Sequence, residues 1–496
     1  MNASHRALVT AGVLATFMQA INISLPNAAV LHIQAALSMT DDEIGWVFTS
    51  YLAASALVMP MTRWLAARFG RRFVFQVSIT IFSAALMLDT LATTPLQFVF
   101  ARVIQGAASG TLAPLSMAIL LDELPPPRHG HIAPVWAVTA LLGIVSGPAI
   151  GGWFSEYHGW HSIFYLSLPA AGFIFLTVSL FLREKKADKH PPFDLFGLAT
   201  LSAGLAGLQM LLDRGERMEW FASTEIWIEA ITSALGFLLF AVHVLTRDEH
   251  FLNKALFRDR NFNLSTLMYF ALGFVLLPTL ALTSPMLEEL FGYPADIAGY
   301  VTIPRGLALV GALLLAWRQP TRIDNRVFLL AGIALAAYGT WMMVGYSPQM
   351  DWRAVATAGV VQGAGIGILI PTLTRSAFST LDPKFRSEGA MFFNLARLFG
   401  STIGISIVLM YFFDNTQSMH LALAGHLNPY GAVARMIGPV SGPKLALINE
   451  MVTGQAALVA VIDQFKLLTI AMLLACPLVL FLRNPRSGNR TLLSRQ

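Results

Sequence analysis

Long apolar runs, separated by short polar connections, cover most of the chain. Each run has about 19 to 24 residues, enough for a helix to cross roughly 30 Å of hydrocarbon. Backbone groups in lipid must pair within the segment, and no strand-like alternation is present, so we predict helices and an all-α integral membrane protein. The fourteen runs are 9–31, 44–64, 73–92, 96–118, 132–154, 162–182, 193–212, 226–246, 264–287, 297–317, 326–346, 354–374, 389–412 and 464–482.

The composition and the placement of charge agree with a membrane protein. Only 12% of the 496 residues are charged, whereas soluble domains carry about 25%. With the amino terminus inside, 24 Lys and Arg residues fall in inside segments and five in outside segments. This bias predicts a bacterial inner-membrane protein with both termini cytoplasmic. Because the basic residues are scattered over short loops, nucleic-acid binding is excluded as a function.

The fourth and twelfth runs share a sequence repeat. Residues 103–114 read VIQGAASGTLAP and residues 360–371 read VVQGAGIGILIP, which are identical at seven of twelve positions. An offset of eight runs predicts two six-helix bundles, 1–190 and 251–496, joined by two inserted helices in 191–250. Within the second bundle, 413–463 is predicted to be a periplasmic loop, with a lid, a surface-lying helix and a disordered loop as the alternatives.

Four motifs stand out, and two of them are marked by small residues and a buried arginine. The fifth run contains GIVSGPAIGGWF, in which Gly143, Gly147, Gly151 and Gly152 form a stripe that lets another helix approach, and Pro148 removes a backbone hydrogen bond. The fourth run contains RVIQGAASG, whose buried Arg102 is costly in a membrane and therefore predicts a pathway or a paired site.

The other two motifs lie at the second loop and in the first run. The loop after the second run reads RWLAARFGRR and includes Arg68 and Arg71. The first run reads FMQAINISLPNAAVL and places the amides of Gln19, Asn22 and Asn27 within the span, where they can hydrogen-bond.

Together these motifs resemble the major facilitator superfamily, and within it the fourteen-span drug:proton antiporters of EmrB/QacA type. The resemblance covers nearly the whole chain and implies export by proton antiport with alternating access, driven by the proton gradient without a bound cofactor. It also implies a periplasmic adaptor and an outer-membrane channel as partners, as for some relatives. Two family aspartates are absent, because Asn22 and Ala67 stand at their positions.

Asp89 is then the best membrane-embedded acid, with snorkelling to the interface as its alternative. We expect gating or proton coupling at the residues Arg102, Asp89, Gly147, Pro148, Gly151, Arg68 and Arg71. We expect the substrate pathway at Gln19, Asn22, Asn27, Gln105, Arg305, Gln362, Asn394 and Arg397.

The cations Arg102, Arg305 and Arg397 lie within runs that lack mid-span carboxylates, so the cavity is expected to attract anions. The substrate is therefore predicted to be a weakly acidic or neutral amphiphile. A uniporter or importer on the same fold is the main alternative. A membrane enzyme is disfavoured because no catalytic or nucleotide-binding motif is found, and a receptor because no long polar signalling segment is present.

Overall fold

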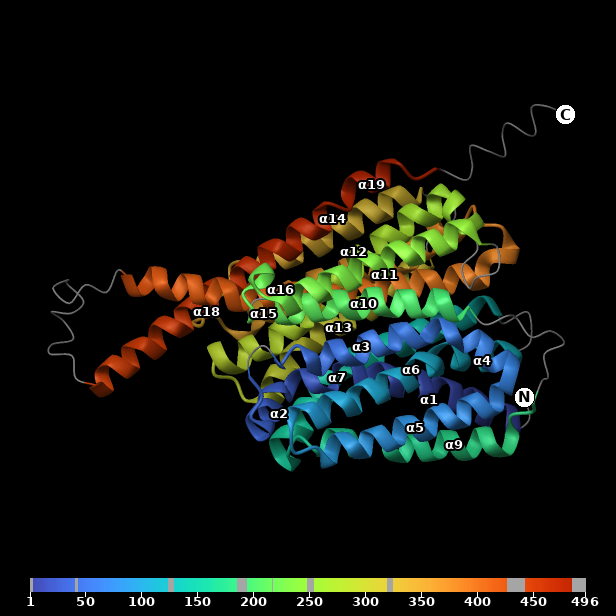
Figure 1. Cartoon of the computed structure of the whole chain (residues 1–496), viewed down its shortest axis with the longest axis horizontal. Coiled ribbons are helices and arrows are strands. Elements are labelled where there is room, and N and C mark those ends of the chain that lie inside the picture. The colour runs from blue at the N-terminus through green and yellow to red at the C-terminus, as the bar shows by residue number, and fades with distance from the viewer. Residues whose placement is uncertain are drawn as a thin grey trace.

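The computed structural model describes residues 3–40, 43–123, 129–184, 194–215, 217–247, 254–318, 324–425 and 442–483. This part of the chain is helical and contains no strand. Thirteen of its helices are long and apolar enough to cross a membrane. The remaining predicted span, 44–64, is also helical, but it breaks at Pro60 into shorter pieces. The prediction of fourteen helices as two six-helix bundles with an inserted pair is confirmed as a fold class (Figure 1).

The first six spans form the amino-terminal bundle. Its helices are α1 (Ala3–Ser24), η1 (Leu25–Ala28), α2 (Val30–Leu37), α3 (Trp46–Val58), η3 (Met59–Met61), α4 (Thr62–Phe69), α5 (Arg71–Leu91), α6 (Pro95–Glu123), α7 (His129–His158), α8 (Ser162–Tyr165) and α9 (Leu168–Phe181).

The last six spans form the carboxy-terminal bundle, and a pair of helices lies between the bundles in sequence. The pair is α10 (Leu195–Arg214) and α11 (Thr224–Thr246), with η5 (Trp220–Ala222) in their connection. The second bundle contains η6 (Lys254–Arg258), α12 (Arg260–Pro285), η7 (Met286–Leu290), α13 (Ala295–Trp317), α14 (Asn325–Met343), α15 (Trp352–Phe378), η8 (Pro383–Phe385), α16 (Arg386–Gly425), α18 (Gly442–Leu473) and α19 (Cys476–Leu480).

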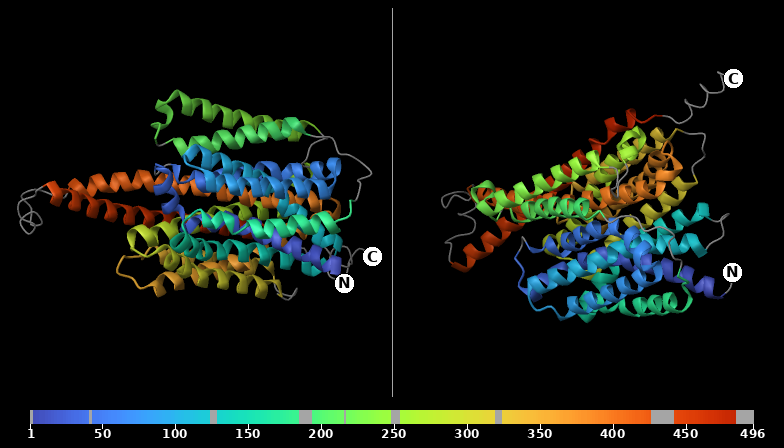
Figure 2. Two further views of the ribbon diagram at one scale, coloured as in Figure 1. Left: turned by 90° about the horizontal axis from the view of Figure 1, so that it is seen from below. Right: turned by 45° about the vertical axis from the view of Figure 1, so that its right-hand side comes forward.

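The α16 and α18 helices correct the expectation of a loop over 413–463. The described parts of this segment are helical, because α16 continues to Gly425 and α18 begins at Gly442. With 40 residues, α16 is about 60 Å long at 1.5 Å per residue, twice the hydrocarbon thickness. The two helices therefore project beyond the bundles as a hairpin (Figures 1 and 2). We call this end of the molecule the hairpin face, and the end where α1 begins and α19 ends the terminal face.

The inserted pair lies at the periphery. In Figure 2 the two green helices lie outside the blue helices of the first bundle. Of the two, α10 packs against α3 and α16, whereas α11 packs mainly on α10. The outer side of α11 exposes large apolar side chains, which suits a helix that faces lipid; they are Trp227, Ile228, Ile231, Leu235, Leu238, Leu239, Val242 and Leu245.

The two copies of the sequence repeat make the same helix contact. A Cβ at Gly106 of α6 would overlap the carbonyl oxygen of Tyr51 in α3, and a Cβ at Gly363 of α15 would overlap that of Arg305 in α13. In both bundles, glycine lets the fourth helix touch the backbone of the second. Position Tyr51 in one bundle thus corresponds to Arg305 in the other.

Candidate functional site

Arg102 lies at the centre of a buried polar cluster in the first bundle. Its side chain is fully buried and donates to the carbonyl oxygen of Val47 at 3.0 Å, to Oε1 of Gln105 at 2.5 Å and to the carbonyl oxygen of Asn22 at 3.3 Å. The guanidinium also lies 4.6 Å from the ring centroid of Tyr51. These contacts come from α1, α3 and α6. The buried charge, which would be costly alone, is therefore solvated by neutral dipoles.

The amides of this cluster extend it towards α1 and the α8–α9 junction. Gln105 donates to Oδ1 of Asn22 at 3.2 Å, and Asn22 donates to Oγ of Ser167 at 2.8 Å. The hydroxyl oxygen of Tyr51 lies 3.2 Å from the carbonyl oxygen of Gln19, to which it can donate, and 2.5 Å from Oγ of Ser109, with which it shares a second hydrogen bond. The structure therefore brings Asn22, Arg102 and Gln105 together, while Gln19 takes part through its backbone. Asn27 is buried separately, in η1.

Asp89 faces the interior of the first bundle and does not snorkel. Its side chain is fully buried, and among the described residues neither carboxylate oxygen has a hydrogen-bond partner. The charge of Arg102 acts on it electrostatically. The snorkelling alternative is wrong because α5 turns this residue towards the bundle interior rather than towards the interface. Asp89 is therefore a buried acid on which the charge of Arg102 acts without a direct contact between them.

The carboxy-terminal bundle holds a second buried cation with fewer partners. Arg305 of α13 is 5% exposed and donates to the carbonyl oxygen of Leu276 at 3.2 Å, but its Nη1 has no hydrogen-bond partner among the described residues. The nearby Tyr346 donates its hydroxyl proton to the carbonyl oxygen of Val355 at 3.2 Å and carries no negative charge to balance the cation. The cation is thus incompletely solvated by the protein.

Gln362 lies in the same bundle, in the second copy of the repeat. Its Nε2 donates to Thr340 at 2.8 Å and to Thr279 at 3.2 Å, but its Oε1 has no partner in the described part of the chain. This amide corresponds to Gln105, whose Oε1 is occupied by Arg102. The first bundle therefore satisfies its amide and its cation with each other, whereas the second leaves a donor and an acceptor open.

Two other predicted pathway residues lie apart from both clusters. Arg397 of α16 is half-buried and lies beside the hydroxyl of Tyr269, whose ring stacks on Phe393 at 4.0 Å between centroids. Asn394 donates to the carbonyl oxygen of Ala390 one turn back in the same helix. The structure does not join either residue to Arg102 or Arg305.

The glycine stripe of α7 packs mainly within its own bundle. Cβ atoms at Gly147 and Gly151 would overlap Ser24 and Leu25, at the end of α1 and in η1. The same helix also meets the second bundle, because Gly299 of α13 lies against the carbonyl oxygen of Pro148. Small residues on both sides therefore bring α7 and α13 into backbone contact along the seam between the bundles.

The basic residues of the loop after the second run lie at the terminal face. Arg71 pairs with Asp122 at 2.6 Å, between α5 and the end of α6, and Arg68 is exposed at the end of α4. The carboxylate of Glu184 occupies the space where a Cβ of Gly70 would lie, and the φ of +90° at this position also favours glycine. The loop has Ala67 where the family has an aspartate. Asp122 at the end of α6 and Glu184 after α9 lie against the loop instead. Arg63 pairs with Glu388 of the other bundle at 2.9 Å.

A further polar cluster, which the sequence did not reveal, joins the inserted pair to both bundles. Asp213 of α10 accepts from Thr49 of α3 at 3.2 Å and from Nε2 of Gln209 at 2.6 Å, and it also hydrogen-bonds Ser406 of α16. The sequence placed Asp213 just outside its span. The spacing of Gln209 and Asp213, one helical turn apart, was the signal that could have found the pair.

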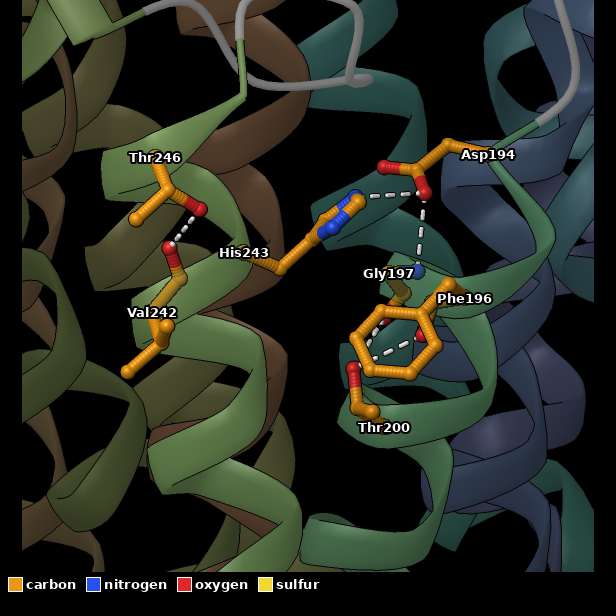
Figure 3. A network of polar contacts seen from close by, with 7 residues as sticks. All are labelled: Asp194, Phe196, Gly197, Thr200, Val242, His243 and Thr246. Carbon is orange, nitrogen blue, oxygen red and sulfur yellow. Dashed lines mark hydrogen bonds and ion pairs between the residues drawn. The ribbon is translucent and has the colours of Figure 1, made fainter.

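The inserted pair is itself held together by polar side-chain contacts between its two helices. Figure 3 shows Asp194, which caps α10 by accepting from the backbone of Gly197 at 2.8 Å and pairs with His243 of α11 at 2.8 Å. At the opposite end, Arg214 of α10 pairs with Glu225 and Glu229 of α11 at 2.6 and 2.7 Å. The two helices are thus fastened to each other at both ends.

Both the sequence and the fold are similar to those of known proteins. A sequence model of the Major Facilitator Superfamily matches residues 12–405. The "Multidrug export protein EmrB" of Haemophilus influenzae is 30% identical, over 85% of this chain and 83% of that protein. The "Fatty acid resistance protein FarB" of Neisseria gonorrhoeae is 29% identical over 95% of both. A crystal structure of a bacterial homologue of the human lysosomal transporter Spinster, inward-facing and unoccupied, has a TM-score of 0.63 at 15% identity, covering 98% of this chain and all of that one.

Proposed function

The chain belongs to the major facilitator superfamily, and from this premise we propose that it exports weakly acidic or neutral amphiphiles across the bacterial inner membrane in exchange for protons. It is a multi-pass membrane transporter rather than an enzyme. Relatives named as multidrug export proteins support export as the direction. The excess of Lys and Arg at the terminal face supports a cytoplasmic position for that face and both termini.

We infer the substrate class from Arg305, whose Nη1 has no hydrogen-bond partner among the described residues. A buried guanidinium with an unpartnered Nη1 is most stable when an anion or a strong acceptor approaches it. The open Oε1 of Gln362 adds an acceptor for a hydroxyl or a protonated acid in the same bundle. A relative at 29% identity is named for fatty acid resistance, which agrees with a carboxylate head on an apolar tail.

We propose that the exchanged proton binds to Asp89 in the first bundle. Asp89 is buried beside the charge of Arg102, and a proton on its carboxyl group removes the cost of burying a second charge. Asn22 does not titrate, so this arrangement takes the place of the aspartate that the family carries in the first span. The contact of Pro148 with Gly299 and the terminal-face cations Arg68 and Arg71 are the proposed gating elements.

The proposed partners are a periplasmic adaptor and an outer-membrane channel. The α16–α18 hairpin projects beyond the hairpin face, which is periplasmic in the proposed orientation. We expect the hairpin to contact such an adaptor, while the two bundles do not touch it.

Transport by purified protein in liposomes tests the proposal. Decanoate and ethidium serve as acidic and cationic probes, each with and without an imposed pH gradient. We expect gradient-driven decanoate transport that falls at least tenfold in Arg305→Gln and is unchanged in Arg318→Gln, which removes an exposed cation at the end of the same helix. Ethidium transport without decanoate transport contradicts the substrate class. Decanoate transport that ignores the gradient favours a uniporter.

A further inference from the structure

The hairpin-face end of α10 lies over the seam between the two bundles. Helix α3 of the first bundle packs against α16 of the second, and α10 contacts both. In a transporter that exposes its site alternately to each side, access at the hairpin face requires these two helices to separate. A polar group that binds both of them at once therefore acts on the opening of this seam.

Asp213 and Gln209 form such a group. Thr49 of α3 donates to Oδ2 of Asp213 at 3.2 Å, and Gln209 lies 2.6 Å from both Oδ2 of Asp213 and Oγ of Ser406 in α16. One short cluster on α10 thus bridges the two bundles. All three of its partners are neutral, so the acid has no ion pair within the cluster to hold it in the charged form.

The amide of Gln209 joins the two contacts. Its Nε2 donates both to Oδ2 of Asp213 and to Oγ of Ser406. The half-buried carboxyl group of Asp213 faces no cation within the cluster. Shielding a carboxylate from water without an ion pair is costly. A proton on Asp213 therefore favours the closed seam, and loss of the proton favours an open, hydrated seam.

A pocket connects this acid with the surface. It has a volume of about 630 Å³ and lies between the end of α10, the start of α3 and the α16–α18 hairpin. Its wall includes Asp213 and reaches Leu421, which is 69% exposed. Its other titratable and charged groups are Arg217, after α10, and His420 of α16; Arg214, next to Asp213, is held by the glutamates of α11.

We propose that Asp213 is a second proton-binding site, carried by the inserted helix pair, that latches α3 to α16 when protonated and releases them when it loses its proton into the hairpin-face pocket. Once ionised, the carboxylate is stabilised by water that enters as the seam opens. Because the pair is fastened at both ends, α10 and α11 respond as one unit. This inference extends the proposed proton exchange, but it concerns the gate and not the substrate.

Distance measurements without substrate test the latch. Spin labels are attached at Ala36→Cys in α2 and Ser418→Cys in α16, both exposed, in a Cys476→Ser background. In lipid nanodiscs, we expect the long-distance population to rise with pH. We expect Asp213→Asn, which cannot ionise, to keep the short distance at every pH. Asp414→Asn, the same change at an exposed acid of α16, should respond as the parent does.

Three results separate the possible outcomes. If Asp213→Asn keeps the parent's pH response, or if His420→Gln abolishes it, the latch is wrong. Thr49→Val and Ser406→Ala each remove one bundle partner and should raise the long-distance population at a given pH, which tests the latch even if Asp213→Asn does not fold. Failure of decanoate transport with the pH response intact contradicts the proposed substrate and leaves the latch standing.

Discussion

Arg305 packs its side chain against Gly359, with its Cβ atom 3.1 Å from where a Cβ of Gly359 would lie. In the sequence repeat, Gly359 stands where Arg102 stands in the first copy. The cation of the second bundle therefore comes from α13 rather than from α15, and it fills the space beside the glycine. Each bundle thus buries one arginine next to the repeat, but only the first surrounds it with a complete set of acceptors.

This contact predicts that Gly359→Ala displaces Arg305. A Cβ at 3.1 Å forces the arginine stem to shift by a few tenths of an ångström, and overpacking of this kind costs about 1–3 kcal/mol. We expect a severalfold loss of decanoate transport and a lower thermal unfolding temperature. Gly311→Ala, on α13 where a Cβ meets nothing within 4 Å, is the control. Equal effects of the two substitutions would contradict the role of the contact.

Arg102 and Gln105 are predicted to act as one unit. Arg102→Ala leaves Oε1 of Gln105 and two backbone carbonyl oxygens without their buried donor, and each unsatisfied buried polar group costs about 1–3 kcal/mol. Gln105→Ala should cost less, and the double variant should fall short of the sum by about 1–2 kcal/mol because the two share a hydrogen bond. Chemical unfolding in detergent measures all three. Additive losses would show that the 2.5 Å contact contributes no coupling.

Gly106 is predicted to tolerate no side chain. A Cβ there would overlap the backbone of α3, which cannot move without disturbing the bundle, so Gly106→Ala should abolish the folded protein or lower its yield sharply. At Gly172 of α9, a Cβ meets nothing within 4 Å, and alanine in a helix is favoured by about 0.5–1 kcal/mol. Size-exclusion profiles and unfolding temperatures of the two variants should therefore move in opposite directions.

Asp194 is predicted to stabilise the inserted pair in two ways. Asp194→Ala removes both the cap of α10 and the contact with His243, and the cap alone contributes about 0.5–2 kcal/mol. His243→Ala removes only the second contact and should cost less. Asp194→Asn retains an acceptor both for the cap and for His243 and should cost the least. Hydrogen exchange of the first turn of α10 reports the difference, and equal protection in all three variants would exclude the capping role.

The helices were predictable because the bilayer imposes their length and apolarity locally. Thirteen long spans, the helical nature of 44–64 and the helix pair between the bundles all follow from hydropathy along the chain. The sequence did not predict the length of α16 and α18, because outside the bilayer their composition no longer distinguishes a helix from a loop. The domain boundaries, the proton site and the pathway residues remain predictions.

The sequence by itself determined the family, the number of spans and the residues that face inward on a single helix, such as Arg102 and Gln105, which stand three positions apart. Only the tertiary structure decided which groups from different helices meet. It turned Asp89 inward, brought Arg305 to Gly359, and placed Asp213 between Thr49 and Ser406. The reason is physical: hydropathy fixes where a helix crosses the membrane, whereas its rotation and its neighbours depend on packing against helices that are far away in the sequence.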